Sequence, residues 1–392
     1  MTKRSSIFIK TIFIGLATVF LSLMMAACSS IVESDQPLIP SLILPSTETP
    51  TAIPTHTLQV TNTIQPTATI VRTPPPLPPL YQSPYLNPMD YPHSYIENAC
   101  DYLKLKWDPN KSEPGTVVMV VMFHSIMKDG NPPPNGIRYA EFTQAMETLK
   151  EQNFEAINME QLVGFLESNN KIPPRSVLLI ADDRHFGQYF NTFFRPLQEK
   201  WGWPVVNAWI SHPQQTSAGL WEENEALSQE GWVDYQAHGV IHYPIVESST
   251  DDYILGELQG SIDFFQQHYN KTPIAFIWPG GNFTYRGIHL ARSLGYKVGF
   301  TVNPRGPIMF NWIPLADQSD PMRPSYLAEG SLNDPLMVLP RYWPSQILTE
   351  IDNVRVMGKE AAAYAEQNKA VELEFYNIVC SPSFGTIPGL NP

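Results

Sequence analysis

Short apolar segments recur through the middle of the chain, and they constrain its fold more than any other feature. The first, Val117–Phe123, holds seven apolar residues in a row. Such a run is typical of a strand that is covered on both faces, because a strand with one wet face alternates apolar and polar side chains. Further strands are predicted at residues 177–180, 205–210, 233–237, 274–277 and 297–302.

Helical patterns separate these strands. Phe142, Met146 and Leu149 share one helix face, a second apolar stripe spans residues 255–265, and residues 285–294 form a third helix. Repeated strand–helix units with doubly buried strands predict an α/β fold with a parallel sheet, either open or closed into a barrel. The sequence has no glycine-rich phosphate loop after a strand, which argues against nucleotide binding. The net charge of −13 argues against nucleic-acid binding.

Polar and small residues follow four of the predicted strands, where each strand ends. They are His124 and Ser125, Asp182 and Asp183, His238 and His242, and the segment 278–281. In a parallel α/β barrel the carboxyl ends of the strands lie on one face, where active sites are built. Together, two imidazoles and one carboxylate make a three-ligand set for a zinc-like ion, and the second aspartate is left as a base.

Each of these motifs has a simpler interpretation when it is taken alone. A pair of histidines four residues apart arises by chance, and it faces one metal ion only if the segment turns like a helix. Adjacent aspartates often begin a helix, and the residues from Phe186 onward look helical. The joint placement at neighbouring strand ends favours the metal site.

Three segments in this order resemble the polysaccharide deacetylases (carbohydrate esterase family 4). They are residues 177–183, which end in Asp-Asp, residues 231–242, which hold both histidines, and residues 276–281, Phe-Ile-Trp-Pro-Gly-Gly. Residues 121–126 and 295–302 resemble the branch of biofilm poly-N-acetylglucosamine deacetylases. The resemblance covers about residues 115–345.

The resemblance implies a distorted (β/α) barrel and hydrolysis of N-acetyl groups on an amino-sugar polysaccharide with a divalent metal, expected to be zinc. It assigns Asp182 as the catalytic base and Gly280 as a backbone donor to the oxyanion. It assigns Asp183, His238 and His242 as the metal ligands. A monomer is expected. The alternative is a non-catalytic relative that binds glycan through the same cleft.

The sequence departs from the family pattern at three positions near these residues. Arg184 stands where the family has glycine and would be strained if the backbone there needs a positive φ. Gly239 replaces a small hydroxyl residue, so a hydrogen bond that fixes the loop is missing. Ile277 replaces an arginine that often orients the base.

The general acid is assigned to His124. No histidine follows His289, so the late histidine of the family does not exist here. In the biofilm branch this residue has moved to the start of the domain, and in a closed barrel the first and last strands are neighbours. His185 is the rival. For substrate contacts we expect Trp209, Trp221, Trp278 and Arg341, although each tryptophan could equally be part of the core.

The N-terminus has the features of an export signal. Lys3 and Arg4 precede an apolar run from residue 7 to residue 25, and small residues then precede Cys28, which resembles a bacterial lipobox. We expect residues 1–27 to be a signal peptide, Cys28 to carry lipid, and the protein to be anchored at the outer face of the cytoplasmic membrane or the cell surface. An ordinary transmembrane anchor is the alternative.

Proline and threonine dominate the next segment, residues 28–96, which is predicted to be a disordered linker. The deacetylase-like barrel is then expected at 97–345, and a helical extension with a tail at 346–392. Cys100 and Cys380 lie near the two ends of this folded part, and export makes a disulfide between them reasonable. Two buried thiols are the alternative.

Overall fold

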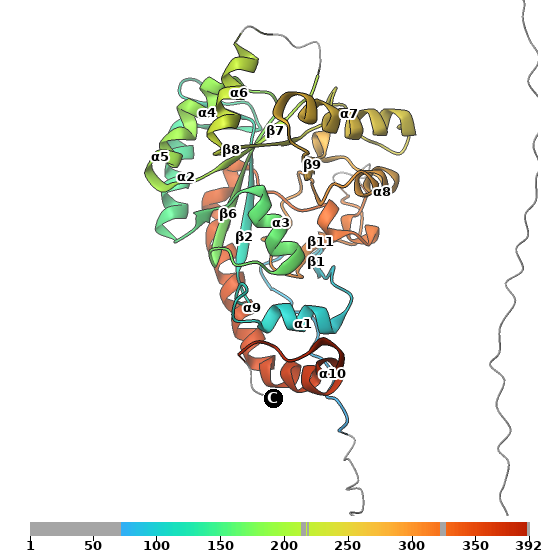
Figure 1. Ribbon diagram of the computed structural model, residues 1–392. Helices are drawn as coiled ribbons and strands as arrows, with labels where there is room; N and C mark the ends of the chain where they lie inside the picture. Colours follow the sequence, from blue (N-terminus) through green and yellow to red (C-terminus); the bar gives the residue numbers. More distant parts are fainter. Residues whose placement is uncertain (1–71, 213–216, 218, 322–326, 390–392) are drawn as a thin grey trace, which may run out of the picture. The chain divides into compact units, whose positions relative to one another are not determined.

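The predicted strands form a parallel sheet. The computed structural model in Figure 1 describes residues 72–212, 217, 219–321 and 327–389. Six strands lie in the order β10-β9-β8-β7-β6-β2, all parallel, and the short β5 pairs with the first half of β6. They are β2 (Val117–Phe123), β5 (Glu155–Ala156), β6 (Arg175–Asp182), β7 (Val205–Trp209), β8 (Val233–Ala237), β9 (Ala275–Ile277) and β10 (Val298–Phe300).

The segment from Leu339 to Tyr342 connects the two edges of this sheet. Leu339 forms a parallel bridge with Phe300 of β10, and Tyr342 forms one with Val121 of β2. Their amide groups donate to Gly299 O and Val120 O, each at 2.8 Å. The sheet therefore closes into a barrel, which confirms the predicted α/β barrel, and Arg341 is placed between the first strand and the last.

Helices lie on the outside of the barrel and beyond its amino end (Figure 1). They are α1 (Ala99–Trp107), α2 (Tyr139–Glu151), α3 (Met159–Ser168), α4 (Gly187–Phe193), α5 (Arg195–Trp201), α6 (Leu220–Glu230), α7 (Asp251–Tyr269), α8 (Tyr285–Ser293), α9 (Ile347–Phe375) and α10 (Ser381–Phe384). Thr250 and Thr284 cap α7 and α8 by accepting backbone N–H groups from the first turns. In the described part of the chain, no helix is long and apolar enough to cross a membrane.

Short elements complete the fold. Two strands flank the barrel as an antiparallel pair, and two more form a parallel pair after β2. These are β1 (Asp90–His93), β11 (Ile313–Ala316), β3 (Ser125–Met127) and β4 (Gly136–Arg138). Single helical turns occur at η1 (Pro279–Gly281), η2 (Glu329–Leu332), η3 (Pro335–Met337), η4 (Pro344–Gln346) and η5 (Tyr376–Cys380).

The chain already contacts the folded domain before the predicted linker boundary at residue 96. Strand β1 pairs with β11, and the Tyr81 hydroxyl donates to Glu360 of α9 at 3.0 Å. Tyr81 also accepts a hydrogen bond from the Trp312 indole through its carbonyl. Aromatic side chains among the prolines supply the apolar contact that holds this segment. The predicted signal peptide and Cys28 lie outside the described residues.

Helix α9 is the predicted C-terminal extension, and it packs directly on the barrel. Glycines allow this contact: a Cβ on Gly358 would lie 2.8 Å from Gly115 O, and one on Gly115 would lie 2.4 Å from Gly358 O. The far end of α9 lies beside α1 and α10 in Figure 1. There a disulfide joins Cys100 and Cys380, whose Cα atoms are 5.3 Å apart.

Candidate active site

Asp182 ends strand β6 at the carboxyl end of the barrel. Only 1% of its surface is exposed. Its Oδ1 accepts a hydrogen bond from Arg341 Nη1 at 2.6 Å, and its Oδ2 lies 3.6 Å from His124 Nε2. The structure therefore brings the predicted base and the predicted general acid together.

Arg341 does not line a substrate cleft, contrary to the prediction. It is fully buried, and its Nε donates to Thr301 O at 2.6 Å while its Nη1 holds Asp182. It reaches Asp182 because the closing segment lies next to β2, and β2 lies next to β6. Arg341 thus lies beside the base, where the family pattern would place the arginine that Ile277 replaces.

The charge state of Asp182 follows from these neighbours. Burial alone would raise the pKa of its carboxyl group, because it disfavours the anion. The positive charge of Arg341, with further contributions from His238 and His124, outweighs burial and lowers the pKa to about 2. Asp182 is therefore a carboxylate, able to accept a proton, across the neutral range.

Asp183, His238 and His242 form a cluster beside this carboxylate. One ligand atom of each lies within 4.8 Å of the other two. The Nε2 atoms of the two histidines are 2.9 Å apart, and Asp183 Oδ1 is 3.9 Å from His238 Nε2 and 3.6 Å from His242 Nε2. These are the three predicted ligands.

The protonation of His238 suits a metal ligand. Its Nδ1 lies 2.7 Å from Ile277 O, and a carbonyl can only accept, so Nδ1 carries the proton and Nε2 keeps its lone pair. Burial lowers the pKa of this imidazole to about 4, which keeps it neutral at neutral pH. Two imidazole nitrogens 2.9 Å apart need a proton or a cation between them, and two nitrogens with one carboxylate are donors that fit a zinc-like ion.

The loop between the two histidines is not a helical turn. Gly239 and His242 have φ angles of 78° and 61°, in the left-handed region. The buried carboxylate of Glu257, on α7, accepts the backbone N–H groups of Val240 and Ile241 at 3.0 Å and that of His242 at 3.3 Å.

Gly239 and Glu257 fit each other. A Cβ at residue 239 would lie 2.4 Å from Glu257 Oε2, so the carboxylate can reach the loop only where residue 239 has no side chain. At Gly239 the hydroxyl group that would fix this loop is missing, and the carboxylate of Glu257 supplies three hydrogen bonds to the loop. The sequence feature that could have revealed Glu257 is a charged residue three positions after Ile254, on the buried face of a helix.

The expected strain at Arg184 is also absent from the structure. The positive φ angle, 74°, belongs to Asp183. The Arg184 guanidinium donates to Ile210 O and to His212 O, and it lies 5.1 Å from the ring centroid of Trp209. Arg184 therefore ties the end of β6 to the segment after β7.

The two candidate histidines for proton donation differ in access. His124 stacks on Trp343, with ring centroids 5.8 Å apart, and keeps 16% of its side chain exposed beside Asp182. His185 stacks on Tyr189 at 3.8 Å, and burial lowers its pKa. The geometry favours His124, and the stacked ring beside it, Trp343, belongs to the segment 341–343 that was expected to line the cleft.

Gly280, the predicted oxyanion donor, lies in η1 directly after β9. Its φ angle is 60°, and the residue is exposed. A Cβ there would lie 3.2 Å from Asn282 Nδ2. The turn thus presents backbone rather than side chain at this strand end.

The predicted tryptophan platform is not supported for two of its three members. Trp209 and Trp278 are fully buried, so neither has a face free for a sugar, and the Trp278 indole donates to Met337 O. Trp221 is half-buried and stacks on His268. Two exposed aromatic residues lie close in the chain to metal ligands: Tyr243 (67% exposed) follows His242, and Phe186 (42% exposed) lies three residues after Asp183.

A closed parallel barrel that carries a buried carboxylate beside an Asp-His-His cluster has the donor set of a metal-dependent hydrolase. Residues 169–299, a third of the chain, match the family model of polysaccharide deacetylase. This segment is therefore similar to the polysaccharide deacetylases. A comparison with curated proteins found no match.

Among solved structures, the chain is similar to the deacetylase PplD of Streptococcus pyogenes in complex with acetate, with 22% identity and a TM-score of 0.48 over 60% of this chain and 98% of that one. It is similar to IcaB from Ammonifex degensii, with 15% identity and a TM-score of 0.46 over 63% and 98% of the two chains. It is also similar to the deacetylase domain of BpsB from Bordetella bronchiseptica, with 19% identity and a TM-score of 0.41 over 60% and 97%.

Proposed function

We propose that this chain is a divalent-metal-dependent deacetylase that removes N-acetyl groups from a cell-surface or extracellular amino-sugar polysaccharide. The observation that carries the proposal is the buried, ionised Asp182, which Arg341 holds beside the cluster of Asp183, His238 and His242. An ion pair with a purely structural role would not need a ligand cluster next to it. Metal-dependent hydrolysis of an amide needs both an ionised base and a set of metal ligands.

Asp183, His238 and His242 would hold the cation. When bound, a zinc-like ion supplies Lewis acidity, which polarises an acetyl carbonyl and lowers the pKa of a water molecule. Asp182 accepts the proton of the attacking water, and its ion pair with Arg341 keeps it unprotonated before that step. The backbone N–H of Gly280 donates to the acetyl oxygen as negative charge develops there.

The leaving amine must take up a proton, because an amide anion is a poor leaving group. His124 is the donor in this proposal, since it lies 3.6 Å from Asp182 Oδ2 and is partly exposed. An imidazole exchanges protons near neutral pH. Tyr243 and Phe186, which are exposed and close in the chain to His242 and Asp183, are candidates for stacking on sugar rings.

The location outside the cell is part of the proposal. It rests on the export signal before Cys28 and on the disulfide between Cys100 and Cys380, a bond that persists in oxidising compartments. Lipid on Cys28 would hold the enzyme on the membrane.

Metal content and acetate release from N-acetylglucosamine polymers test the proposal together. His238→Ala should lose both the metal and the activity, whereas Asp182→Asn should keep the metal and lose the activity. If the unmodified protein binds the polymer but releases no acetate in the presence of zinc, manganese or cobalt, it is a glycan-binding relative and the proposal is wrong.

The pH dependence of the rate tests the role of His124. His124→Gln, with its metal content verified, should lose the alkaline limb of the profile, and His185→Gln should keep it. An unchanged rate in the His124 variant would exclude it as the general acid.

A further inference from the structure

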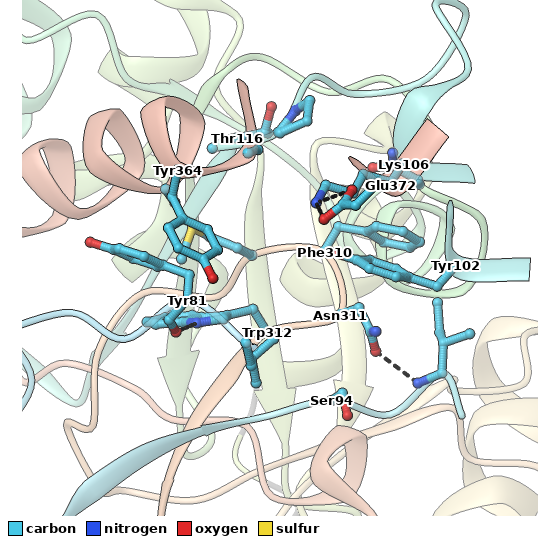
Figure 2. Close-up of a pocket in the computed structure, with 18 of the residues that line it drawn as sticks. Tyr81, Ser94, Tyr102, Lys106, Thr116, Phe310, Asn311, Trp312, Tyr364 and Glu372 are labelled. Carbon is cyan, nitrogen blue, oxygen red and sulfur yellow. Dashed lines mark hydrogen bonds and ion pairs between the residues drawn. The ribbon is translucent and has the colours of Figure 1, made fainter. Parts of the chain in front are cut away.

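A cavity lies at the amino end of the barrel strands. It has a volume of about 260 Å³ and is shown in Figure 2. Gly115 and Thr116, which precede β2, line it, whereas His124 follows β2. The seven residues of β2 rise by roughly 3.3 Å each, so the cavity and the candidate active site are on the order of 20 Å apart.

Two groups of aromatic rings form the walls of this cavity. Tyr81, Trp312 and Tyr364 lie on one side in Figure 2, and Tyr102 and Phe310 lie on the other. The ring centroids of Tyr81 are 6.1 Å from Trp312 and 5.6 Å from Tyr364, and those of Tyr102 and Phe310 are 6.0 Å apart. Four of the five rings are half-buried, which leaves part of their surface facing open space.

The charged residues that line the cavity are mostly acidic. Lys106 pairs with Glu372 at 2.8 Å, and the side chains of both are at least nine-tenths buried. Glu97 and Glu113 also line the cavity, are exposed, and have no ion-pair partner within the described part of the chain. The lining therefore has an excess of negative charge beside the faces of aromatic rings.

This combination favours a cation on a ring whose C–H faces can stack on aromatic side chains. The negative faces of aromatic rings attract cations, and unpaired carboxylates add to that attraction. A volume of about 260 Å³ lies below the roughly 300–1,000 Å³ of pockets for drug-sized ligands, so it suits about one ring.

We propose that this cavity binds a de-N-acetylated amino-sugar unit of the polysaccharide. The proposal rests on the proposed function, because deacetylation converts a neutral acetamido group into an amine that is protonated near neutral pH. The enzyme would then hold a segment of polymer that has lost its acetyl groups while the other end of the barrel acts on acetylated units.

Two covalent and polar links keep the walls in place before a ligand binds. The disulfide joins Cys100 of α1 to Cys380, after α9, and these two helices contribute Tyr102 and Tyr364 to opposite walls. The Tyr364 hydroxyl donates to Pro79 O at 2.8 Å, which fixes the proline-rich segment along the cavity. Little conformational entropy remains to be lost on binding.

Binding calorimetry on the full chain tests the proposal. The chain carries Asp182→Asn, so that it cannot deacetylate the N-acetylglucosamine probe during the measurement. The probes are a glucosamine tetramer and an N-acetylglucosamine tetramer at low salt. The glucosamine tetramer should bind at least tenfold more tightly. Ala361→Trp, which fills the cavity from α9, should weaken that binding at least tenfold, while Ala363→Trp, on the exposed face of the same helix, should leave it unchanged.

Equal affinity for the two tetramers, or unchanged glucosamine binding in Ala361→Trp, would overturn the proposal. If Ala361→Trp does not fold, the double variant Glu97→Gln and Glu113→Gln decides instead: it should bind at least threefold more weakly, and unchanged binding would refute the site. Acetate release by the unmodified chain is measured separately. Glucosamine binding through the cavity without acetate release would contradict the proposed function and leave this site standing.

Discussion

Removing the charge of Arg341 should change the acidity of the candidate base by an amount that the structure allows us to work out. The side chains of Arg341 and Asp182 are 0% and 2% exposed, so solvent screens their interaction little. Two unit charges about 4 Å apart interact by about 4 kcal/mol at an effective dielectric constant of about 20. Since 1.36 kcal/mol corresponds to one pKa unit, Arg341→Met should raise the pKa of Asp182 from about 2 by about 2–3.

The acid limb of the kcat/KM profile for acetate release reports this change, because it follows the protonation of the base in the free enzyme. In Arg341→Met the limb should move up by about 2–3 pH units, and in Arg341→Lys, which keeps the charge, by less. Loss of one partner of a buried pair also costs about 3–5 kcal/mol of stability, so the thermal midpoint and metal content must be checked first. A folded, metal-loaded Arg341→Met variant with an unmoved acid limb would refute the role of Arg341.

Three other properties follow from the structure. Gly239→Ala should weaken metal binding at least tenfold in a competition titration, because its Cβ would lie 2.4 Å from Glu257 Oε2. The control variant Gly256→Ala should bind the metal normally, since its Cβ would meet nothing within 4 Å. Equal metal affinities of the two variants would refute the role of the loop. The disulfide closes a loop with a sequence separation of 280, so the double serine variant of Cys100 and Cys380 should lose about 3–5 kcal/mol in urea unfolding, and no loss would contradict that. The pKa values of His238 and Asp182 are lower in the folded state than in the unfolded state, so the unfolded chain binds more protons. The metal-free protein should therefore lose stability from about pH 6.5 to pH 4 through His238, and again below about pH 4 through Asp182. A stability that does not change over this pH range would contradict both assignments.

The barrel could be predicted from sequence because its signals are local. A strand buried on both faces needs a continuous apolar run, and Val117–Phe123 has the same bounds in the sequence pattern and in the structure. The closing segment could not be found this way. Leu339 and Tyr342 make only single bridges to the neighbouring strands. The apolar run 336–339 ends at Pro340, so no strand pattern covers the closing segment.

The candidate site divides in the same way. The residues that follow strands, such as Asp182 and His238, could be placed together because parallel strands align their carboxyl ends. Arg341 could not be paired with Asp182, since that contact depends on which segment closes the barrel. The sequence also could not predict which aromatic side chains are exposed to solvent. Trp209 and Tyr243 both lie near strand ends in the chain, yet Trp209 is fully buried and Tyr243 is 67% exposed.

The linker shows a limit of composition as evidence. Counting prolines and threonines treats residues 72–96 like the segment before them, although the rings of Tyr81, Tyr91 and Tyr95 stand among the prolines. Tyr81 packs against Trp312 and Tyr364, and the Tyr95 hydroxyl donates to Leu166 O. A few large side chains at fixed positions thus decide whether a proline-rich segment docks on a folded domain.

The departures from the deacetylase pattern bear on whether the protein catalyses a reaction or only binds glycan. Two of them are matched by residues from distant parts of the chain: Arg341 holds Asp182 where Ile277 cannot, and Glu257 holds the histidine loop beside Gly239. Both side chains are charged and almost completely buried, which costs desolvation free energy that apolar residues in their places would avoid. A surface that only binds sugar has no use for an ionised carboxylate buried beneath it, or for a backbone loop fixed by three hydrogen bonds. An enzyme needs both, because the base must stay unprotonated and the metal ligands must keep their positions while the bonds to the acetyl group change.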